Sequence, residues 1–471
     1  MTPLLNNFDY TTYLSAFTTR YGSPEMRTIW SEIHKRKLWR KIWAALAKVE
    51  YKQGLLSKEE LSDILSQQEN IDIPQAHAYA KEIYHELMSE IKTYASQAPI
   101  GGGKLHLGAT SADILDNATI IQVHESLRLT RTKLVSLLDS FSKRIEENKD
   151  IVCMGYTHLQ PAEPTTLGYR LAFYTQDLLH DLQLLDNLIP FIQGKGMKGA
   201  VGTSASYTKL LTGKKYDAFQ LEDDVLKELG ISAVNITGQT YPRKIDWLVV
   251  MILSSIAASL HKFCFDFRIM VAPNFGEWSE KIDKKRVGSS AMPFKKNPDK
   301  VEKICSLARF VSSLQTVAWS NPANSLLERT LDDSANQRIF LPEGFLAIDE
   351  CLTETQKIVQ TFVINQEAVT RNLYTYGDFS ATESLLMDLV KKGGDRQEMH
   401  EKLKELSFLA WTDVQRGKPN PLQQLLLQEP TFLSFLSTAQ IQKHFNPLTH
   451  IGIAKERTQR FLKILQKYLR S

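Results

Sequence analysis

Apolar residues recur at helical spacing along most of the chain. In the stretch 26–51, Leu38, Ile42 and Leu46 fall on one face, with charged residues on the other. In the stretch 111–148 the apolar positions are spaced by seven, four and three residues, which predicts one long helix. The same reasoning predicts helices over residues 167–189, 244–269 and 301–317. Helices of this length are typical of a bundle.

Polar residues with capping chemistry mark where several helices begin. Ser23 followed by Pro24 predicts a helix N-cap and first turn. Thr110 and Asp113 have the spacing of a capping box, with Asp in place of Glu. Thr110 and Ser111 are therefore expected at the top of the long helix, with hydroxyls and free backbone N–H groups.

No alternation of apolar and polar residues extends beyond a few positions, so no sheet is predicted. We predict an all-α, three-domain fold with a central bundle of long helices. Asn365 is placed to cap a new set of shorter helices. The predicted domains are an N-terminal helical domain at 1–110, the central bundle at 111–364 and a C-terminal helical domain at 365–471.

The composition is that of a soluble globular protein, with 43% hydrophobic and 23% charged residues among 471. A net charge of +4, against 57 basic and 53 acidic residues, does not indicate nucleic acid as a partner. The four cysteines form no CxxC pair, so a reducing cytoplasm fits better than a zinc site or a disulfide framework. No signal peptide is visible at the start. The apolar run 247–253 breaks at Ser254, short of the roughly 20 residues of a membrane span, and predicts a buried helix.

The most informative stretch is residues 288–298, Gly-Ser-Ser-Ala-Met-Pro-Phe-Lys-Lys-Asn-Pro. Its glycine and prolines predict a loop whose backbone can approach a ligand closely. Lys295 and Asn297 precede a helix expected to begin near Asp299, so a bound carboxylate would meet side-chain donors and a helix N-terminus together. The alternative is a flexible linker, but a linker has no need for Met292, two prolines and an asparagine in one stretch.

Two histidines and a glycine-rich segment are weaker candidates. His158 is expected in a loop bounded by prolines, where proton transfer and a simple loop role are equally favoured. His85 is expected inside a helix at 81–96, where a structural role is the more common one. The segment 194–206 lacks the Gly-Lys-Ser/Thr ending of a phosphate loop, so it predicts close packing or a tight turn.

A polar segment at residues 327–338 offers a set of anion-binding groups. Arg329, Ser334 and Arg338 within it could converge on a phosphate. Their spacing alone favours an ordinary ion-pair network at a helix start.

Taken together, these stretches resemble one known superfamily. The helix start at Thr110, the His158 loop and the loop 288–298 resemble, in chain order, three segments that build the shared site of fumarase/aspartase enzymes. Within that superfamily the chain most resembles the adenylosuccinate lyases, from about residue 19 to the C-terminal domain. The narrower resemblance rests on the stretches 20–26, 106–111, 198–203, 237–244, 328–336 and 392–402.

The resemblance implies a three-domain helical subunit that assembles into a homotetramer with shared active sites. It implies β-elimination of fumarate from adenylosuccinate, giving AMP, and from SAICAR, giving AICAR, in purine nucleotide biosynthesis. The implied substrate is a small-molecule nucleotide, and no metal or organic cofactor is implied. Neither nucleic acid nor a membrane is expected as a partner.

The same resemblance implies roles for individual residues. Ser289 is implied as the base and His158 as the acid. Glu302 is implied to orient His158, His85 to assist near the leaving group, and Lys295 to hold a succinyl carboxylate. The implied substrate-binding residues are Arg20, Tyr21, Thr110, Ser111, Thr157, Gln239, Asn297, Arg329, Ser334 and Arg338.

Two positions depart from the family pattern. Tyr84 stands where members often have arginine, which removes a cation from the expected nucleotide pocket, and Ser204 replaces a usual glutamine. A second hypothesis is another fumarate-releasing lyase, such as one acting on argininosuccinate, which would not need the phosphate set at Arg329, Ser334 and Arg338. A third is a helical oligomer without catalysis, which the presence of the implied catalytic residues disfavours.

Overall fold

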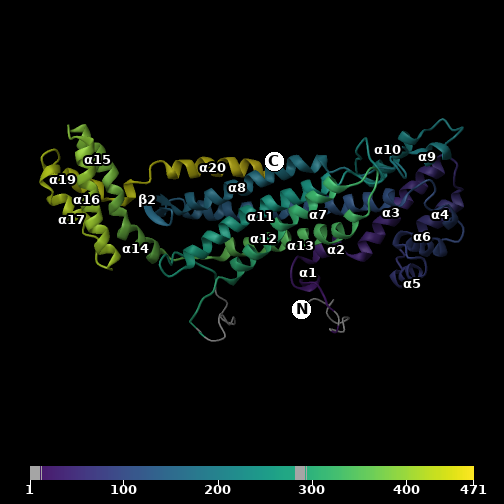
Figure 1. Cartoon of the computed structure of the whole chain (residues 1–471), viewed down its shortest axis with the longest axis horizontal. Helices are drawn as coiled ribbons and strands as arrows, with labels where there is room; N and C mark the ends of the chain where they lie inside the picture. Colours follow the sequence, from purple (N-terminus) through teal and green to yellow (C-terminus); the bar gives the residue numbers. More distant parts are fainter. Residues whose placement is uncertain (1–10, 12, 282–291, 293, 471) are drawn as a thin grey trace. The chain divides into compact units, whose positions relative to one another are not determined.

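The computed structural model describes residues 11, 13–281, 292 and 294–470, and Figure 1 labels its elements. Helices dominate these residues, which confirms the predicted all-α class. Two short antiparallel strand pairs were not predicted from the sequence. They are β1 (Val152–Thr157) with β2 (Gln160–Thr166), and β3 (Trp278–Ser279) with β4 (Val363–Ile364). The pattern concealed them because β3 and β4 have two residues each and β2 contains two prolines.

In chain order, the described helices form one group before residue 111, a second group between residues 111 and 361 that includes the five longest, and a third group after residue 365. The first group is α1 (Ala16–Thr19), α2 (Pro24–Ile29), α3 (Glu32–Lys52), α4 (Lys58–Ser66), α5 (Ile73–Ile83), α6 (Glu86–Gln97) and η2 (Gly102–Lys104). The second is α7 (Ser111–Asn148), α8 (Leu167–Leu188), η3 (Ile189–Phe191), α9 (Ala205–Leu210), α10 (Ala218–Leu229), α11 (Lys244–Val271), α12 (Asp299–Asn324) and α13 (Asp332–Thr361). The third is α14 (Gln366–Tyr376), η4 (Gly377–Ser380), α15 (Ala381–Lys391), α16 (Arg396–Gln415), α17 (Leu422–Gln428), α18 (Pro430–Leu433), α19 (Thr438–Gln442), η5 (Lys443–Phe445), η6 (Pro447–Thr449) and α20 (Ala454–Arg470).

The chain forms two compact units, each assembled from three separate stretches. The first unit comprises Met1–Leu134, Asp181–Ala258 and Ser306–Thr353, and the second comprises Val135–His180, Ser259–Cys305 and Glu354–Ser471. The long helices α7, α8, α11, α12 and α13 contribute residues to both units. The three-domain division at residues 110 and 364 stays a prediction.

The first unit has a hydrophobic cluster around α3. Trp39, Trp43 and Leu46 are buried there, because the apolar stripe of α3 faces α4 and α10. Ion pairs join the long helices within this unit. The Arg131 guanidinium on α7 contacts Asp186 of α8 at 2.6 Å, and Lys133 of α7 contacts Asp349 of α13 at 2.5 Å.

Packed regions of the second unit include its parts of the long helices and the C-terminal helices. On its parts of the long helices, the rings of Phe141 and Phe263 meet edge to face with centroids 5.2 Å apart. The C-terminal helices build a separate cluster that includes Leu385, Leu403 and Phe432. Asn365 caps α14 as predicted, since its side chain accepts the Ala368 N–H at 3.2 Å.

Two predicted helices are interrupted. The predicted helix 26–51 is split between α2 and α3, because the Ser31 hydroxyl caps α3 by accepting the His34 N–H. The predicted helix 81–96 is split between α5 and α6, because Tyr84 adopts a left-handed conformation with φ of 52° and His85 caps α6. In both places a capping residue outweighs the continuous apolar pattern.

The most apolar helix, α11, extends beyond the run 247–253. Its 28 residues confirm the helix predicted over 244–269, in which Ser254 and Ser255 end the apolar run without ending the helix. The Ser255 hydroxyl donates to Asp181 at 2.5 Å. By length and composition α11 could cross a membrane, a test that core helices of soluble proteins also pass. Within its most apolar window 56% is buried inside the protein, which supports the prediction of a buried helix.

Candidate active site

A cavity of about 200 Å³ lies in the first unit at the beginning of α13. Arg329, Ser334 and Arg338 all line it, so the fold brings this predicted set together. Ser334 belongs to the first turn of α13, where backbone N–H groups and the helix dipole favour an anion. Two guanidinium groups, one hydroxyl and a helix N-terminus therefore face the same space.

Two of the four cations that line this cavity form no ion pair with a carboxylate of the described residues. Lys35 contacts Glu32 at 2.7 Å and Glu86 at 2.8 Å, so its charge is compensated. By contrast, Arg329 and Arg338 have no acidic partner within the described part of the chain, and the Arg329 Nε is buried without a hydrogen-bond acceptor. Unpaired buried guanidinium nitrogen is costly unless a ligand supplies the acceptor. The arrangement is suited to a dianion such as a phosphate.

A buried ion-pair network forms the wall of this cavity. The Arg243 guanidinium contacts Asp333 at 2.5 Å through Nε, and its two terminal nitrogens donate to Asp116 at 3.3 Å. Asp116 also accepts the backbone N–H of Tyr241 at 2.9 Å. Because this guanidinium is fully engaged with carboxylates, Arg243 holds α7, α11 and α13 together and is not left for a ligand.

A protonatable carboxyl lies behind the same wall. Asp246 accepts hydrogen bonds from the Tyr241 hydroxyl at 2.6 Å and from the Gln337 amide at 2.7 Å. Burial raises the pKa of Asp246 to about 6, although the nearby Arg243 charge and these hydrogen bonds act in the opposite direction. These hydrogen bonds rigidify the start of α11, although the Asp333 Oδ1 is buried without a hydrogen-bond partner in the described part of the chain.

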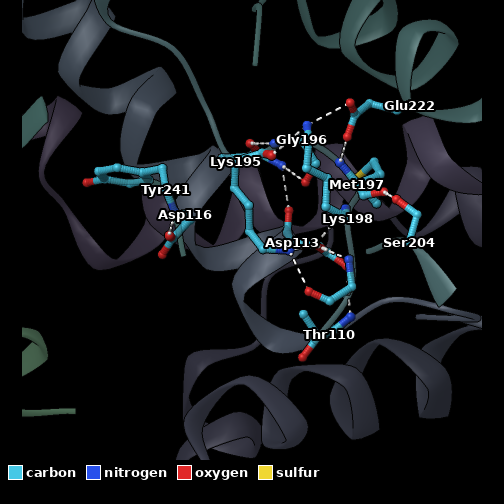
Figure 2. Close-up of polar contacts among 12 residues, drawn as sticks. Thr110, Asp113, Asp116, Lys195, Gly196, Met197, Lys198, Ser204, Glu222 and Tyr241 are labelled. Carbon is cyan, nitrogen blue, oxygen red and sulfur yellow. Dashed lines mark hydrogen bonds and ion pairs between the residues drawn. The ribbon is translucent and has the colours of Figure 1, made fainter. Parts of the chain in front are cut away.

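The beginning of α7 presents a second set of donors in the first unit. Ser111 is its first helical residue, and Thr110 immediately precedes it, as predicted. Part of the predicted capping box is present, because the Thr110 N–H donates to Asp113 at 2.9 Å (Figure 2). The hydroxyls of Thr110 and Ser111 are half-buried and have no partner within the described residues. They are available to a ligand carboxylate.

Three other predicted binding residues of the first unit do not line the cavity. Arg20 lies over the Tyr21 ring with its guanidinium carbon 5.6 Å from the centroid, and both precede α2. Gln239 lies in the segment before α11, and its backbone N–H donates to the Glu328 carbonyl at 2.9 Å. That bond places Gln239 next to the residue that precedes Arg329.

His85 is an exposed capping residue and not a residue inside a helix. Its Nδ1 accepts the Met88 N–H at 3.2 Å, so this nitrogen is unprotonated in the capped state. The following residue, Glu86, lines the cavity of the first unit and accepts from Lys35. His85 thus lies one residue from the cavity, and its predicted assisting role stays a prediction.

His158 occupies the tip of the β1–β2 hairpin in the second unit. Thr157 pairs with Gln160, so His158 and Leu159 form a two-residue turn, and both have positive φ, as in a type I′ turn. His158 is exposed and lines a cavity of about 390 Å³. A side chain at the tip of a tight hairpin is held by the backbone while its ring remains accessible, which suits proton transfer.

The remaining predicted residues of the second unit lie near the beginning of α12. The Glu302 carboxylate is 3.7 Å from the Arg268 guanidinium, and Glu302 does not line the cavity that contains His158. Lys295 is exposed and Asn297 is half-buried in the segment before α12. Ser289 lies outside the described residues.

With the geometry in place, comparison with known proteins gives the family. The family described as "Lyase" matches residues 19–312, and "Adenylosuccinate lyase C-terminus" matches residues 378–461. An adenylosuccinate lyase from Schistosoma mansoni is 37% identical, over 96% of this chain and 95% of its own length. The chain belongs to the adenylosuccinate lyase family. Further family members are those of Saccharomyces cerevisiae (35% identical, 98% of both chains) and Archaeoglobus fulgidus (31% identical, 96% of this chain and 98% of that one). Membership confirms the predicted lyase class.

Solved structures support the fold of this adenylosuccinate lyase family member. A fumarate lyase from Mesorhizobium sp. BNC1 superimposes with a TM-score of 0.82 at 21% identity. A 3-carboxy-cis,cis-muconate lactonizing enzyme from Pseudomonas putida superimposes with a TM-score of 0.83 at 23% identity. Each match covers 96% of this chain and 99% of the other. The predicted fumarase/aspartase-like architecture is confirmed.

The two departures from the adenylosuccinate lyase pattern have different surroundings. Tyr84 is 90% exposed and does not line the cavity of the first unit. Ser204 has a left-handed φ of 52°, and its hydroxyl donates to the Met197 carbonyl at 3.4 Å. Ser204 therefore belongs to the packing of the glycine-rich segment and not to the cavity wall.

The ion-paired residues that hold the site together, Arg243, Asp116 and Asp333, were not predicted from the sequence. Arg243 and Asp333 lie in stretches that carry the family resemblance, but no role was assigned to them. A signal did exist, because Arg243 and Asp333 are opposite charges at the starts of two long helices. Spacing cannot show that residues 90 positions apart meet at 2.5 Å.

Proposed function

We propose that this lyase catalyses the β-elimination of fumarate from adenylosuccinate, releasing AMP, and the same reaction on SAICAR, releasing AICAR. The names of its relatives support the first substrate. The structural observation that supports it best is the pair of uncompensated guanidinium groups, Arg329 and Arg338, beside Ser334 at a helix N-terminus. A nucleotide monophosphate needs such a site, whereas argininosuccinate carries no phosphate.

The proposed reaction has three chemical events. A base removes the proton from the carbon beside a carboxylate, the electron pair forms the double bond of fumarate, and the C–N bond breaks as an acid protonates the departing nitrogen. We assign the base to Ser289 and the acid to His158, with His85 near the leaving group. The support for His158 is its accessible position at a rigid hairpin tip.

Carboxylate binding is assigned to the donors at two helix starts. Thr110 and Ser111 precede or begin α7 with unoccupied hydroxyls, and Lys295 and Asn297 precede α12. These groups would stabilise the negative charge that develops beside the carboxylate in the transition state. Arg20, Tyr21, Thr157 and Gln239 are proposed as further substrate contacts and Glu302 as the partner of His158.

We further propose a cytoplasmic homotetramer of three-domain subunits with shared active sites. Large apolar side chains are exposed on the long helices, which supports burial in an assembly. They include Phe173 and Leu184 of α8, Met251 and Phe265 of α11, Trp319 of α12 and Ile339 of α13. The four cysteines are buried and form no disulfide with one another in the described part of the chain, which fits a reducing compartment.

The decisive experiment is an ultraviolet assay of the purified protein with adenylosuccinate, with argininosuccinate in parallel. AMP and fumarate should appear in equal amounts from the first substrate only. Arg338→Gln should raise KM for adenylosuccinate by about 10- to 100-fold, the scale of a lost charge-assisted hydrogen bond. Arg460→Gln, an exposed arginine on α20, is the matched control and should not change KM. Turnover of argininosuccinate, or an unchanged KM in Arg338→Gln, would overturn the proposal.

A further inference from the structure

A buried carboxylate, Asp113, is the centre of the polar contacts around the beginning of α7 (Figure 2). It accepts the Thr110 N–H at 2.9 Å and the Tyr207 hydroxyl at 3.2 Å. It also accepts the backbone N–H groups of Lys198 and Gly199, each at 3.2 Å, and contacts the Lys195 ammonium group. Asp113 is fully buried, so these donors replace the water that a charged carboxylate would otherwise need.

The cation that faces Asp113 is itself anchored. Lys195 is fully buried, and its ammonium group also donates to the Gly199 carbonyl at 2.9 Å. A neighbouring pair holds the other side of the same segment, because Lys198 contacts Glu222 at 2.7 Å and Glu222 accepts the Met197 N–H at 2.7 Å. The glycine-rich segment 194–204 is thereby fixed as a rigid support for the beginning of α7 and is not a nucleotide loop.

The charge and position of Asp113 affect how strongly an anion can bind at Thr110 and Ser111. A bare carboxylate in the first turn of a helix would repel an anion bound at the same helix end. The Lys195 contact cancels that charge. Asp113 meanwhile occupies the Thr110 N–H and holds the backbone that carries the two free hydroxyls.

We propose that Asp113, neutralised by Lys195, is a positioning residue that orients Thr110 and Ser111 toward a carboxylate of the substrate. The proposal rests on the proposed function for the identity of that carboxylate, a succinyl group. The phosphate cavity is held separately, by Arg243 with Asp116 and Asp333. Loss of Asp113 should therefore weaken carboxylate binding and spare nucleotide binding.

The test measures product inhibition by fumarate and by AMP separately. In Asp113→Asn the side-chain amide places N–H donors against the donors of Lys195 and the backbone, so Thr110 should lose its fixed orientation. The inhibition constant of fumarate should rise about tenfold, while that of AMP stays within about twofold of the wild type. A general loss of structure would move both constants together.

Because Asp113→Asn leaves the charge of the buried Lys195 without its carboxylate partner, that variant is prone to misfolding. The double variant Asp113→Asn/Lys195→Met removes the uncompensated charge and should recover the thermal stability while keeping the weak fumarate inhibition. Tyr207→Phe removes one donor to Asp113 without changing any charge and should weaken fumarate about two- to fivefold.

Asp217→Asn is the matched control. Asp217 caps α10 in the same unit by an equivalent reciprocal pair of hydrogen bonds with Gln220. It is far from Thr110 in the sequence and has no proposed part in substrate binding. Both inhibition constants should be unchanged in this variant. Wild-type fumarate inhibition in the folded double variant and in Tyr207→Phe, or a parallel rise in both constants, would refute the positioning role. Failure of the wild type to cleave adenylosuccinate would instead refute the proposed function.

Discussion

Glu50 is a carboxyl group inside the hydrophobic interior of the first unit. It lies near the end of α3, is 1% exposed, and its Oε1 has no hydrogen-bond partner within the described residues. Burial raises the pKa of Glu50 from its ordinary 4.5 to about 8, and the charge of Lys104 offsets this only in part. At neutral pH the folded protein therefore holds Glu50 as a neutral acid, whereas the unfolded chain releases the proton.

The direction of the pH dependence follows from proton binding. Between pH 4.5 and about 8 the folded state binds the Glu50 proton and the unfolded state does not, so the free energy of unfolding falls as the pH rises. Each pH unit in this window removes about 1.4 kcal/mol. From about pH 5 to about pH 7.5 the loss from this one group is about 3 kcal/mol.

Glu50→Gln removes the titration but keeps the shape of the side chain. Relative to the wild type, the variant should gain about 3 kcal/mol more stability at about pH 7.5 than at about pH 5. Urea unfolding followed by tryptophan fluorescence measures this difference at equal protein concentration, since Trp39 and Trp43 lie in the same hydrophobic cluster. Glu82→Gln, at an exposed position of α5, should match the wild type at both pH values. Parallel pH profiles of Glu50→Gln and the wild type would refute the reasoning.

Two further variants test the hairpin and the glycine-rich segment. His158→Asn should lower kcat by roughly two to four orders of magnitude, because asparagine cannot transfer the proton. The circular dichroism spectrum should stay unchanged, because asparagine tolerates the φ of 53°. Near-normal turnover would remove the assignment of His158 as the acid. Gly202→Ala should destabilise the protein by about 1 to 3 kcal/mol in urea unfolding, because the added Cβ would lie 2.0 Å from the Thr237 carbonyl. It should also raise KM, because the clash displaces the backbone that leads to Gln239. Gly199→Ala has the same kind of φ but open space around it, so equal effects in both variants would show that φ alone is responsible.

The long helices were predictable because their signal is long. The apolar pattern of 111–148 continues for ten turns, and the structure has one helix with those bounds. Interruptions were not predictable from the pattern, because they depend on single capping residues such as Ser31 and His85. The β1–β2 hairpin was missed because β2 carries two prolines and neither strand shows a clear alternation of apolar and polar residues.

The candidate site was predictable in its residue types but not in its charge balance. Spacing favoured an ion-pair network for Arg329, Ser334 and Arg338, yet the fold leaves both arginines without acidic partners in its described part. The acids that pattern reasoning would have paired with them are used elsewhere. Asp333, close to both in sequence, is taken by Arg243 from the start of another helix.

Which cations remain available to a ligand depends on which of them are already paired with carboxylates. Only the fold determines that pairing. Lys35 is used by Glu32 and Glu86, and Arg243 by Asp116 and Asp333. The net charge of +4 says nothing about this, because it counts paired and unpaired groups alike. After pairing, the cavity of the first unit keeps two guanidinium groups that can donate to a phosphate, whereas the beginning of α7 keeps only hydroxyls and a neutralised Asp113. A ligand with a phosphate at one end and a carboxylate at the other matches that division of charge, and this is why fumarate and AMP should respond separately when either set is altered.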